Sequence, residues 1–162
     1  MTEREYNECV KLYADNVYRF ILKNLRHSED AQDVVQSAFE KLWINREQVD
    51  GEKAKSYLFT IAYHQMIDHL RKVKRMSYKE EIPDQALGSE HQPQRFVKQA
   101  LDQALATLTE TQRNLVMLKD YEGYNYQEIG EIMGLNESQV KVYLHRARLQ
   151  LRNYLVRKEH VV

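Results

Sequence analysis

The sequence is poor in the residues that crosslink or break a polypeptide chain. Its 162 residues include 1 cysteine, 2 prolines and 5 glycines. The single cysteine, Cys9, excludes an intrachain disulfide and any zinc site built on several cysteines. Because sandwiches and barrels need many tight turns, the scarcity of proline and glycine argues against both architectures. We therefore predict an all-α fold.

Long apolar runs are missing as well. No stretch of about 18 apolar residues occurs, so the sequence predicts no insertion into a membrane. Glu3, Glu5, Glu8 and Lys11 interrupt the start of the chain, which therefore lacks the apolar core of a signal peptide. Basic and acidic residues number 24 each, and 43% hydrophobic residues suffice for a packed core. We expect a folded, cytoplasmic protein.

Both prolines fall in one short segment. Pro83 and Pro93 lie within residues 77–94, which also contain Gly88 and four acidic residues against one lysine. This segment lacks helical apolar periodicity, as is typical of a linker. The sequence therefore predicts two small helical domains, residues 1–76 and 95–162, joined by a flexible linker over 77–94.

The apolar spacing of the N-terminal domain predicts three helices. The first carries apolar residues at helical intervals over 10–25. The second begins at Ser28 as its N-cap and extends its apolar stripe to Trp43. After a break at Asp50 and Gly51, the third helix occupies residues 54–75. The outer face of the second helix is mostly acidic, which fits either a solvated surface or a docking surface for a protein.

Four helices are predicted in the C-terminal domain. Two run over 96–106 and 110–121. A short helix then begins at the cap Asn125 and ends at Gly134, and the last helix begins at the capping box of Asn136. The last two form a helix-turn-helix arrangement, in which the exposed N-terminal half of the second helix fits a DNA major groove.

Two groups of side chains suit nucleic acid. The exposed half of the last helix offers Glu137, Ser138, Lys141, Val142, His145 and Arg146, and residues 137–158 carry six cations against one acid. On the third helix, the residues off the apolar side are Tyr63, His64, Ile67, Asp68 and Arg71, beside a basic end. Aromatic rings next to cations suit single-stranded nucleic acid. The plain alternatives are a solvated basic face and a basic tail that complements a helix dipole.

Signatures of catalysis are weak. His64 and Asp68 stand one helical turn apart, but two ligands without a third make a poor metal site. Cys9 has no implied base partner, and the sequence contains no glycine-rich phosphate loop or nucleophile elbow. The sequence therefore predicts no enzyme activity, no catalytic residue, no metal and no cofactor.

Several motifs share one family resemblance. Residues 30–43 closely resemble conserved region 2.2 of the sigma-70 family of bacterial transcription initiation factors. Resemblance to regions 2.3 and 2.4 covers 57–62 and 67–72, and resemblance to region 4 covers 108–113, 126–134 and 140–148. The motif order, the linker and the length are similar to those of the extracytoplasmic-function (ECF) sigma factors.

The resemblance implies a non-catalytic initiation factor that binds core RNA polymerase and directs it to promoter DNA. In the family, region 2.2 docks on the clamp helices of the polymerase β′ subunit. That role falls here on Asp30, Asp33, Gln36 and Glu40. We also expect contacts with the β subunit, and the acidic linker is compatible with a basic channel of the polymerase.

The resemblance also implies two surfaces that contact promoter DNA. Capture of unstacked bases at the minus-10 element falls on the loop 49–53, with Val49 and Lys53, and on Tyr63, His64, Ile67, Asp68 and Arg71. Reading of the duplex minus-35 element falls on Ser138, Lys141, Val142, His145 and Arg146, with Lys119 and Arg148 on phosphates. Phosphate contacts set affinity and register, and base-edge contacts set specificity.

Two other classes of protein compete with this interpretation. A free-standing helix-turn-helix repressor or activator would dimerise on duplex DNA and would not need a helix like region 2.2. An interaction module that sequesters a partner would not need an intact basic recognition helix. Many ECF sigma factors are held inactive by an anti-sigma factor, often membrane-bound, but the sequence identifies none for this chain.

Overall fold

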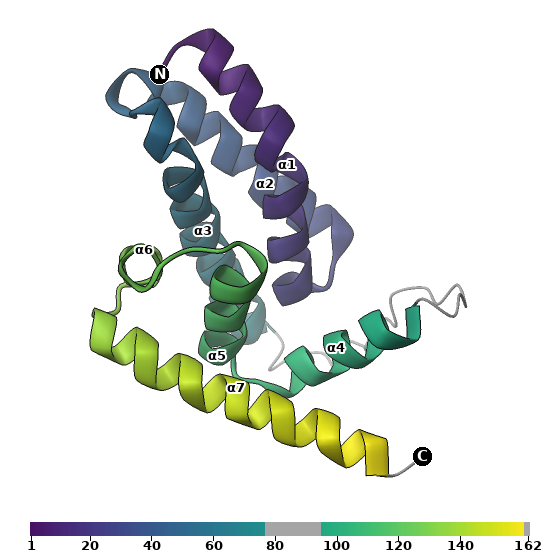
Figure 1. Cartoon of the computed structure of the whole chain (residues 1–162). Coiled ribbons are helices and arrows are strands. Elements are labelled where there is room, and N and C mark those ends of the chain that lie inside the picture. Colours follow the sequence, from purple (N-terminus) through teal and green to yellow (C-terminus); the bar gives the residue numbers. More distant parts are fainter. Residues whose placement is uncertain (77–94, 161–162) are drawn as a thin grey trace. The chain divides into compact units, whose positions relative to one another are not determined.

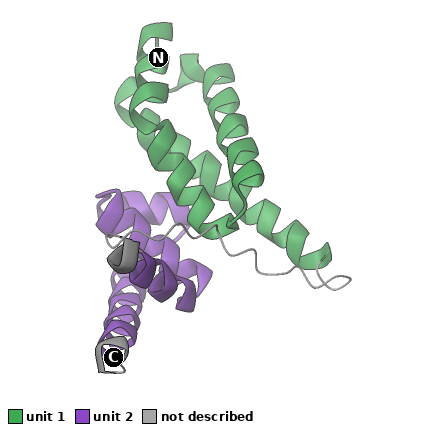
Figure 2. Cartoon of the chain, turned by 90° about the vertical axis from the view of Figure 1, so that its right-hand side faces the viewer, with its two compact units in different colours: residues 1–87 green, residues 88–162 purple. Residues whose placement is uncertain are grey.

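The computed structural model of the protein describes residues 1–76 and 95–160. All regular elements in these ranges are helical, which confirms the predicted all-α fold. The chain separates into two compact units, Met1–Leu87 and Gly88–Val162 (Figure 2). The predicted linker, residues 77–94, lies outside the described residues. Within the described ranges, no helix has the length and apolar content needed to cross a bilayer.

Three helices form the first unit: α1 (Glu3–Leu25), α2 (Ser28–Ile44) and α3 (Ala54–Met76), which pack against one another (Figure 1). Each buries the apolar stripe that the sequence shows. Phe20 and Phe59 meet edge to face in the core, with their ring centroids 5.6 Å apart. The largest fully buried side chains here are Val17, Phe20, Ile21, Leu42, Leu58, Phe59 and Met66.

The start of α2 differs from the prediction by one residue. Ser28 is the first helical residue, and the cap is His27, whose backbone is extended at φ −135°. The imidazole Nδ1 of His27 accepts a hydrogen bond from the backbone amide of Asp30, 3.3 Å away. The prediction of Ser28 as the N-cap was wrong because it considered only the residue types that most often cap helices.

Two short 3₁₀ helices connect α2 to α3. They are η1 (Arg46–Gln48) and η2 (Gly51–Lys53), and the carboxylate of Asp50 caps the second by accepting from the backbone amide of Glu52 at 3.1 Å. Val49 lies between them with only 7% of its surface exposed. The predicted chain break at Asp50 and Gly51 therefore corresponds to a compact connection.

The second unit contains α4 (Arg95–Thr107), α5 (Glu110–Val116), η3 (Met117–Tyr121), α6 (Tyr126–Met133) and α7 (Glu137–His160). The predicted helix 110–121 is thus divided. Its second part, η3, is a π-helical turn. Such widened turns are rare and occur frequently at functional sites. Helix α7 packs against α4, α5 and α6 (Figure 1).

Caps define the helix-turn-helix as predicted. Gly134 ends α6 at φ 71°, a left-handed conformation that strains any residue with a side chain. The amide of Gln139 donates to Asn136 Oδ1 at 2.8 Å, and Gln139 Oε1 accepts from the amide of Asn136 at 3.0 Å. Asn125 and Glu128 form the matching box at the start of α6. These caps determine where α6 ends and where α7 begins, with a short turn between them.

Candidate protein and nucleic-acid interfaces

The acidic face of α2 is built from three exposed residues one turn apart. Asp33, Gln36 and Glu40 are all exposed, and Gln36 Nε2 donates a hydrogen bond to Glu40 Oε1 at 3.4 Å. The buried residues of this helix are Ala31, Val34, Ala38, Phe39 and Leu42, on the opposite side. The sequence-predicted acidic surface therefore exists as one continuous face, which we call the α2 acidic face.

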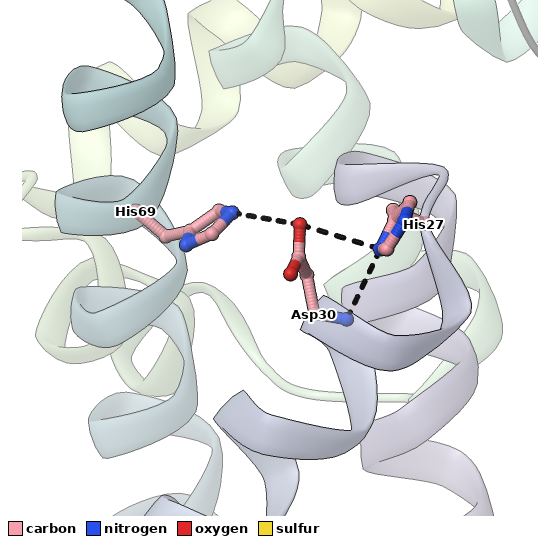
Figure 3. Close-up of polar contacts among 3 residues, drawn as sticks. All are labelled: His27, Asp30 and His69. Atoms are coloured by element: carbon pink, nitrogen blue, oxygen red, sulfur yellow. Dashed lines mark hydrogen bonds and ion pairs between the residues drawn. The ribbon is translucent and has the colours of Figure 1, made fainter. Parts of the chain in front are cut away.

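Asp30 differs from these three residues because its carboxylate contacts other parts of the same unit. Asp30 Oδ2 lies 3.2 Å from His69 Nε2 on α3 and 3.4 Å from His27 Nδ1 (Figure 3). All three side chains are partly exposed, so the pairing adds little to stability. The arrangement links the start of α2 to α3, and it places Asp30 at the α3-facing edge of the helix.

A second polar contact joins the same two helices two turns further along α2. The side-chain amide of Gln65 on α3 lies 3.0 Å from Ser37 Oγ. Ser37 follows Asp30 by seven residues and His69 follows Gln65 by four, so each pair shares one side of its helix. These contacts fix the position of α3 relative to the α2 acidic face.

An exposed stripe runs along the other side of α3. His64, Asp68 and Arg71 are exposed and follow one another at intervals of four and three residues, while Ile67 is half-buried. Tyr63 is not part of this surface, because only 9% of it is exposed. Its ring lies 5.7 Å from the His64 ring, edge to face, so Tyr63 supports His64 from within the core.

The loop residues predicted for the minus-10 surface separate into two kinds. Lys53 is exposed at the end of η2. Val49 is buried, and its carbonyl accepts a hydrogen bond from the ammonium of Met1 at 2.9 Å. The structure therefore places the Lys53 side chain at the surface and the Val49 and Tyr63 side chains inside the unit, a difference that the residue types along the sequence do not show.

The N-terminal half of α7 presents its predicted face. The exposed residues of this half are Ser138, Lys141, Val142, His145 and Arg146. Val142 is 46% exposed although it is apolar. Val140, Leu144 and Ala147 are buried against the rest of the unit. An exposed apolar side chain among cations suits contact with a base edge in a major groove.

A cluster centred on Tyr126 lies at one edge of this face. Lys119 Nζ lies 4.8 Å from the centroid of the Tyr126 ring, and Lys141 Nζ lies 5.5 Å from it. Arg148 donates to both carboxylate oxygens of Asp120, with Nε 3.2 Å from Oδ2. The hydrogen bonds to Asp120 raise the pKa of the Arg148 guanidinium. Reasoning from the sequence selected Lys119, Lys141 and Arg148 but missed Tyr126.

Cys9 lies in surroundings that do not favour a reactive thiol. Cys9 is only 4% exposed, and burial raises the pKa of its thiol to about 11. A thiol in such surroundings is a poor nucleophile at neutral pH. In the part of the chain that the structure describes, no three His, Cys, Asp or Glu side chains gather as a metal-binding group.

Two helical units, one of which contains a helix-turn-helix with an exposed cationic face, define a DNA-binding protein. Comparison with family models matches residues 9–76 to sigma-70 region 2 and residues 98–151 to sigma-70 region 4. The ECF RNA polymerase sigma factor SigM of Bacillus subtilis is 30% identical over 153 residues, covering 90% of this chain and 92% of SigM. RNA polymerase sigma factor YlaC of the same organism is 26% identical, covering 93% and 91%.

Solved structures have the same fold. The sigma factor RpoE of Bartonella quintana, in complex with the anti-sigma factor NepR, is similar at a TM-score of 0.76 and 23% identity, covering 94% of this chain and 97% of RpoE. CnrH, in complex with the cytosolic domain of CnrY, is similar at a TM-score of 0.71 and 20% identity, covering 95% and 89%. The chain belongs to the ECF subfamily of the sigma-70 family, whose members direct RNA polymerase to promoters.

Proposed function

We propose that this ECF sigma factor performs promoter-directed initiation with three separate helix faces. One contacts core RNA polymerase, one holds unstacked bases of the minus-10 element, and one reads the minus-35 duplex. The observation that carries the proposal is the exposed, cationic N-terminal half of α7 in a capped helix-turn-helix, in the same chain as the α2 acidic face. A free-standing regulator that binds duplex DNA would not need the α2 acidic face.

The α2 acidic face is the proposed docking surface for the clamp helices of the polymerase β′ subunit. Asp33, Gln36 and Glu40 are exposed and lie on one side of α2, so they are available to a cationic partner. Asp30 contributes from the edge, where its second role is to contact His69. Complementary charge favours rapid and specific docking. Contacts with the β subunit are proposed for the chain as a whole.

For the minus-10 element, the proposed surface combines His64, Ile67, Asp68 and Arg71 of α3 with Lys53 of the preceding connection. The ring and the apolar side chain can pack on an extruded base, while the cations hold the strand backbone. Extrusion of a base costs a few kcal/mol, and contacts to the flipped base return part of that cost. No ATP chemistry is needed, and we propose that the protein is not an enzyme.

Reading of the minus-35 duplex is assigned to Ser138, Lys141, Val142, His145 and Arg146 of α7, with phosphate contacts from Lys119 and Arg148. Arg148 also pairs with Asp120, which fixes the direction of its guanidinium before DNA arrives. The domain limits 1–76 and 95–162 and a cytoplasmic location belong to the same proposal. Because RpoE, a protein of this fold, is known bound to an anti-sigma factor, we include an anti-sigma factor among the partners.

Transcription in vitro tests the proposed function directly. We expect core RNA polymerase with the purified chain to initiate at a defined set of sites in a genomic DNA library, and core polymerase alone to miss these sites. Sequencing of the 5′ ends of the transcripts identifies the sites, and gel filtration shows whether the chain co-elutes with the polymerase. Unchanged start sites and separate elution would contradict the assignment.

Base capture by α3 makes a more specific prediction. His64→Ala removes an exposed ring from the proposed pocket, so we expect open complexes to form several-fold more slowly, while binding to closed duplex DNA changes little. Permanganate reactivity of unpaired thymines measures the first quantity, and a gel-shift assay measures the second. Strand opening at the wild-type rate would remove His64 from the base-capture surface.

A further inference from the structure

We propose that Tyr126 is a positioning residue that holds Lys119 and Lys141 in place for the phosphate backbone of the minus-35 duplex. The proposal rests on the proposed function of α7 and deepens it. Tyr126 is the first residue of α6, directly after the cap Asn125. It lies among three elements that the chain brings together at one edge of the helix-turn-helix.

Geometry supports this role. The ammonium groups of Lys119 and Lys141 come from η3 and α7, which are distant in sequence, yet both lie over the Tyr126 ring at 4.8 and 5.5 Å from its centroid. These distances fall within the range in which a cation is attracted by the face of an aromatic ring. The ring therefore gives two flexible side chains one common partner.

The surrounding charges explain why such a partner matters. Lys119, Lys141 and Arg148 are three cations near one another, with Asp120 paired to Arg148 and Glu137 paired to Lys141 at 3.5 Å. The two lysines repel each other, and their common attraction to the Tyr126 ring opposes that repulsion. A lysine that is already held loses less side-chain freedom when it meets a phosphate, so a preorganised pair binds more tightly.

Arg148 is tied to the element that carries Lys119. Its guanidinium donates two hydrogen bonds to Asp120, the residue after Lys119 in η3. The part of Tyr126 that contacts the two lysines is its ring. Tyr126→Phe keeps this ring and Tyr126→Leu removes it, so the two variants isolate the contribution of the ring.

The test uses holoenzyme assembled from core RNA polymerase and the full chain, with a promoter fragment that the wild-type holoenzyme selects from a genomic library. Each released phosphate contact lowers the slope of log K against log salt by about one unit. We expect Tyr126→Leu to lower this slope by about one to two units and to weaken binding several-fold. We expect Tyr126→Phe to stay near wild type. Tyr121→Leu makes the same change at an exposed tyrosine of this unit, so it is the control and should leave the slope unchanged.

A double-mutant cycle shows whether the effect passes through the lysines. We expect Lys119→Met to lower promoter affinity less in the Tyr126→Leu background than in the wild-type protein, because the ring no longer holds Lys119 there. Fully additive losses, or an unchanged slope in Tyr126→Leu, would overturn the proposal. An equal loss of affinity on a template that lacks the minus-35 element would also overturn it, because such a loss would indicate general misfolding of the variant. If the wild-type holoenzyme bound this template and the full template equally, minus-35 reading by α7 would itself be wrong.

Discussion

Replacing two acids on the α2 acidic face, Asp33→Arg together with Glu40→Arg, is expected to abolish binding to core RNA polymerase. Both side chains are exposed, and the change reverses the charge of the face. Like charges brought together at an interface cost several kcal/mol, so roughly 3 kcal/mol, or more than a hundredfold in affinity, is a conservative expectation. Pull-down of core polymerase by the tagged chain, at two salt concentrations, measures the loss.

The fold should survive this double substitution. Neither carboxylate is buried, and the contact of Glu40 with Gln36 is an exposed one, so the free energy of unfolding should change by less than about 0.5 kcal/mol. Glu8→Arg together with Asp15→Arg makes the same charge change on exposed positions of α1 and is the matched control. Wild-type pull-down by the α2 variant, or equal loss in the α1 variant, would refute docking by this face.

Asp30 allows a finer distinction within the predicted docking set. Its carboxylate lies within hydrogen-bond distance of His69 on α3, whereas the Asp33 and Glu40 side chains are exposed. The sequence groups the four predicted docking residues of α2 together, because helical periodicity separates only a buried side from an exposed one. It does not show which exposed residue lies at the edge that faces a neighbouring helix. The structure supplies this distinction.

Local signals explain why most of the fold could be predicted. The caps at Asn125 and Asn136 and the glycine at 134 act through their own backbone neighbours, so their effect is readable from the sequence. His27 shows the limit of this reasoning, since its cap depends on the direction of an imidazole. The widened turn η3 also escaped prediction, because apolar periodicity hardly differs between one α-helical and one π-helical turn.

Tertiary contacts decide the remaining differences. Val49 and Tyr63 belong to segments that suit a DNA surface, but packing against the rest of the first unit buries both. Tyr126 shows the opposite case, in which a ring on an apparently ordinary packing position gathers cations from distant segments. The sequence gives the type and spacing of such residues along one helix. The approach of η3 and α7 to α6 depends on the whole unit.

Arg146 carries the second large prediction, because it is exposed on the N-terminal half of α7, and an arginine at a base edge can donate two hydrogen bonds. We expect Arg146→Ala to weaken minus-35 binding by about 1–3 kcal/mol and to relax sequence preference at one position of the element. If the side chain contacts only phosphate, the loss should be equal on all sequences, and the salt slope should fall by about one unit.

Competition between promoter fragments that differ at single minus-35 positions separates these two outcomes. Arg157→Ala is the matched control, since Arg157 is exposed on the same helix but lies beyond the N-terminal half that faces the groove. A loss of affinity that is confined to one base pair would assign Arg146 to base reading. Such a role needs a fixed helix-turn-helix, which the two capping boxes provide. A base contact depends on orientation, whereas a phosphate contact tolerates motion. Wild-type binding to every fragment would remove Arg146 from the interface and leave Lys141, Val142 and His145 to specify the element.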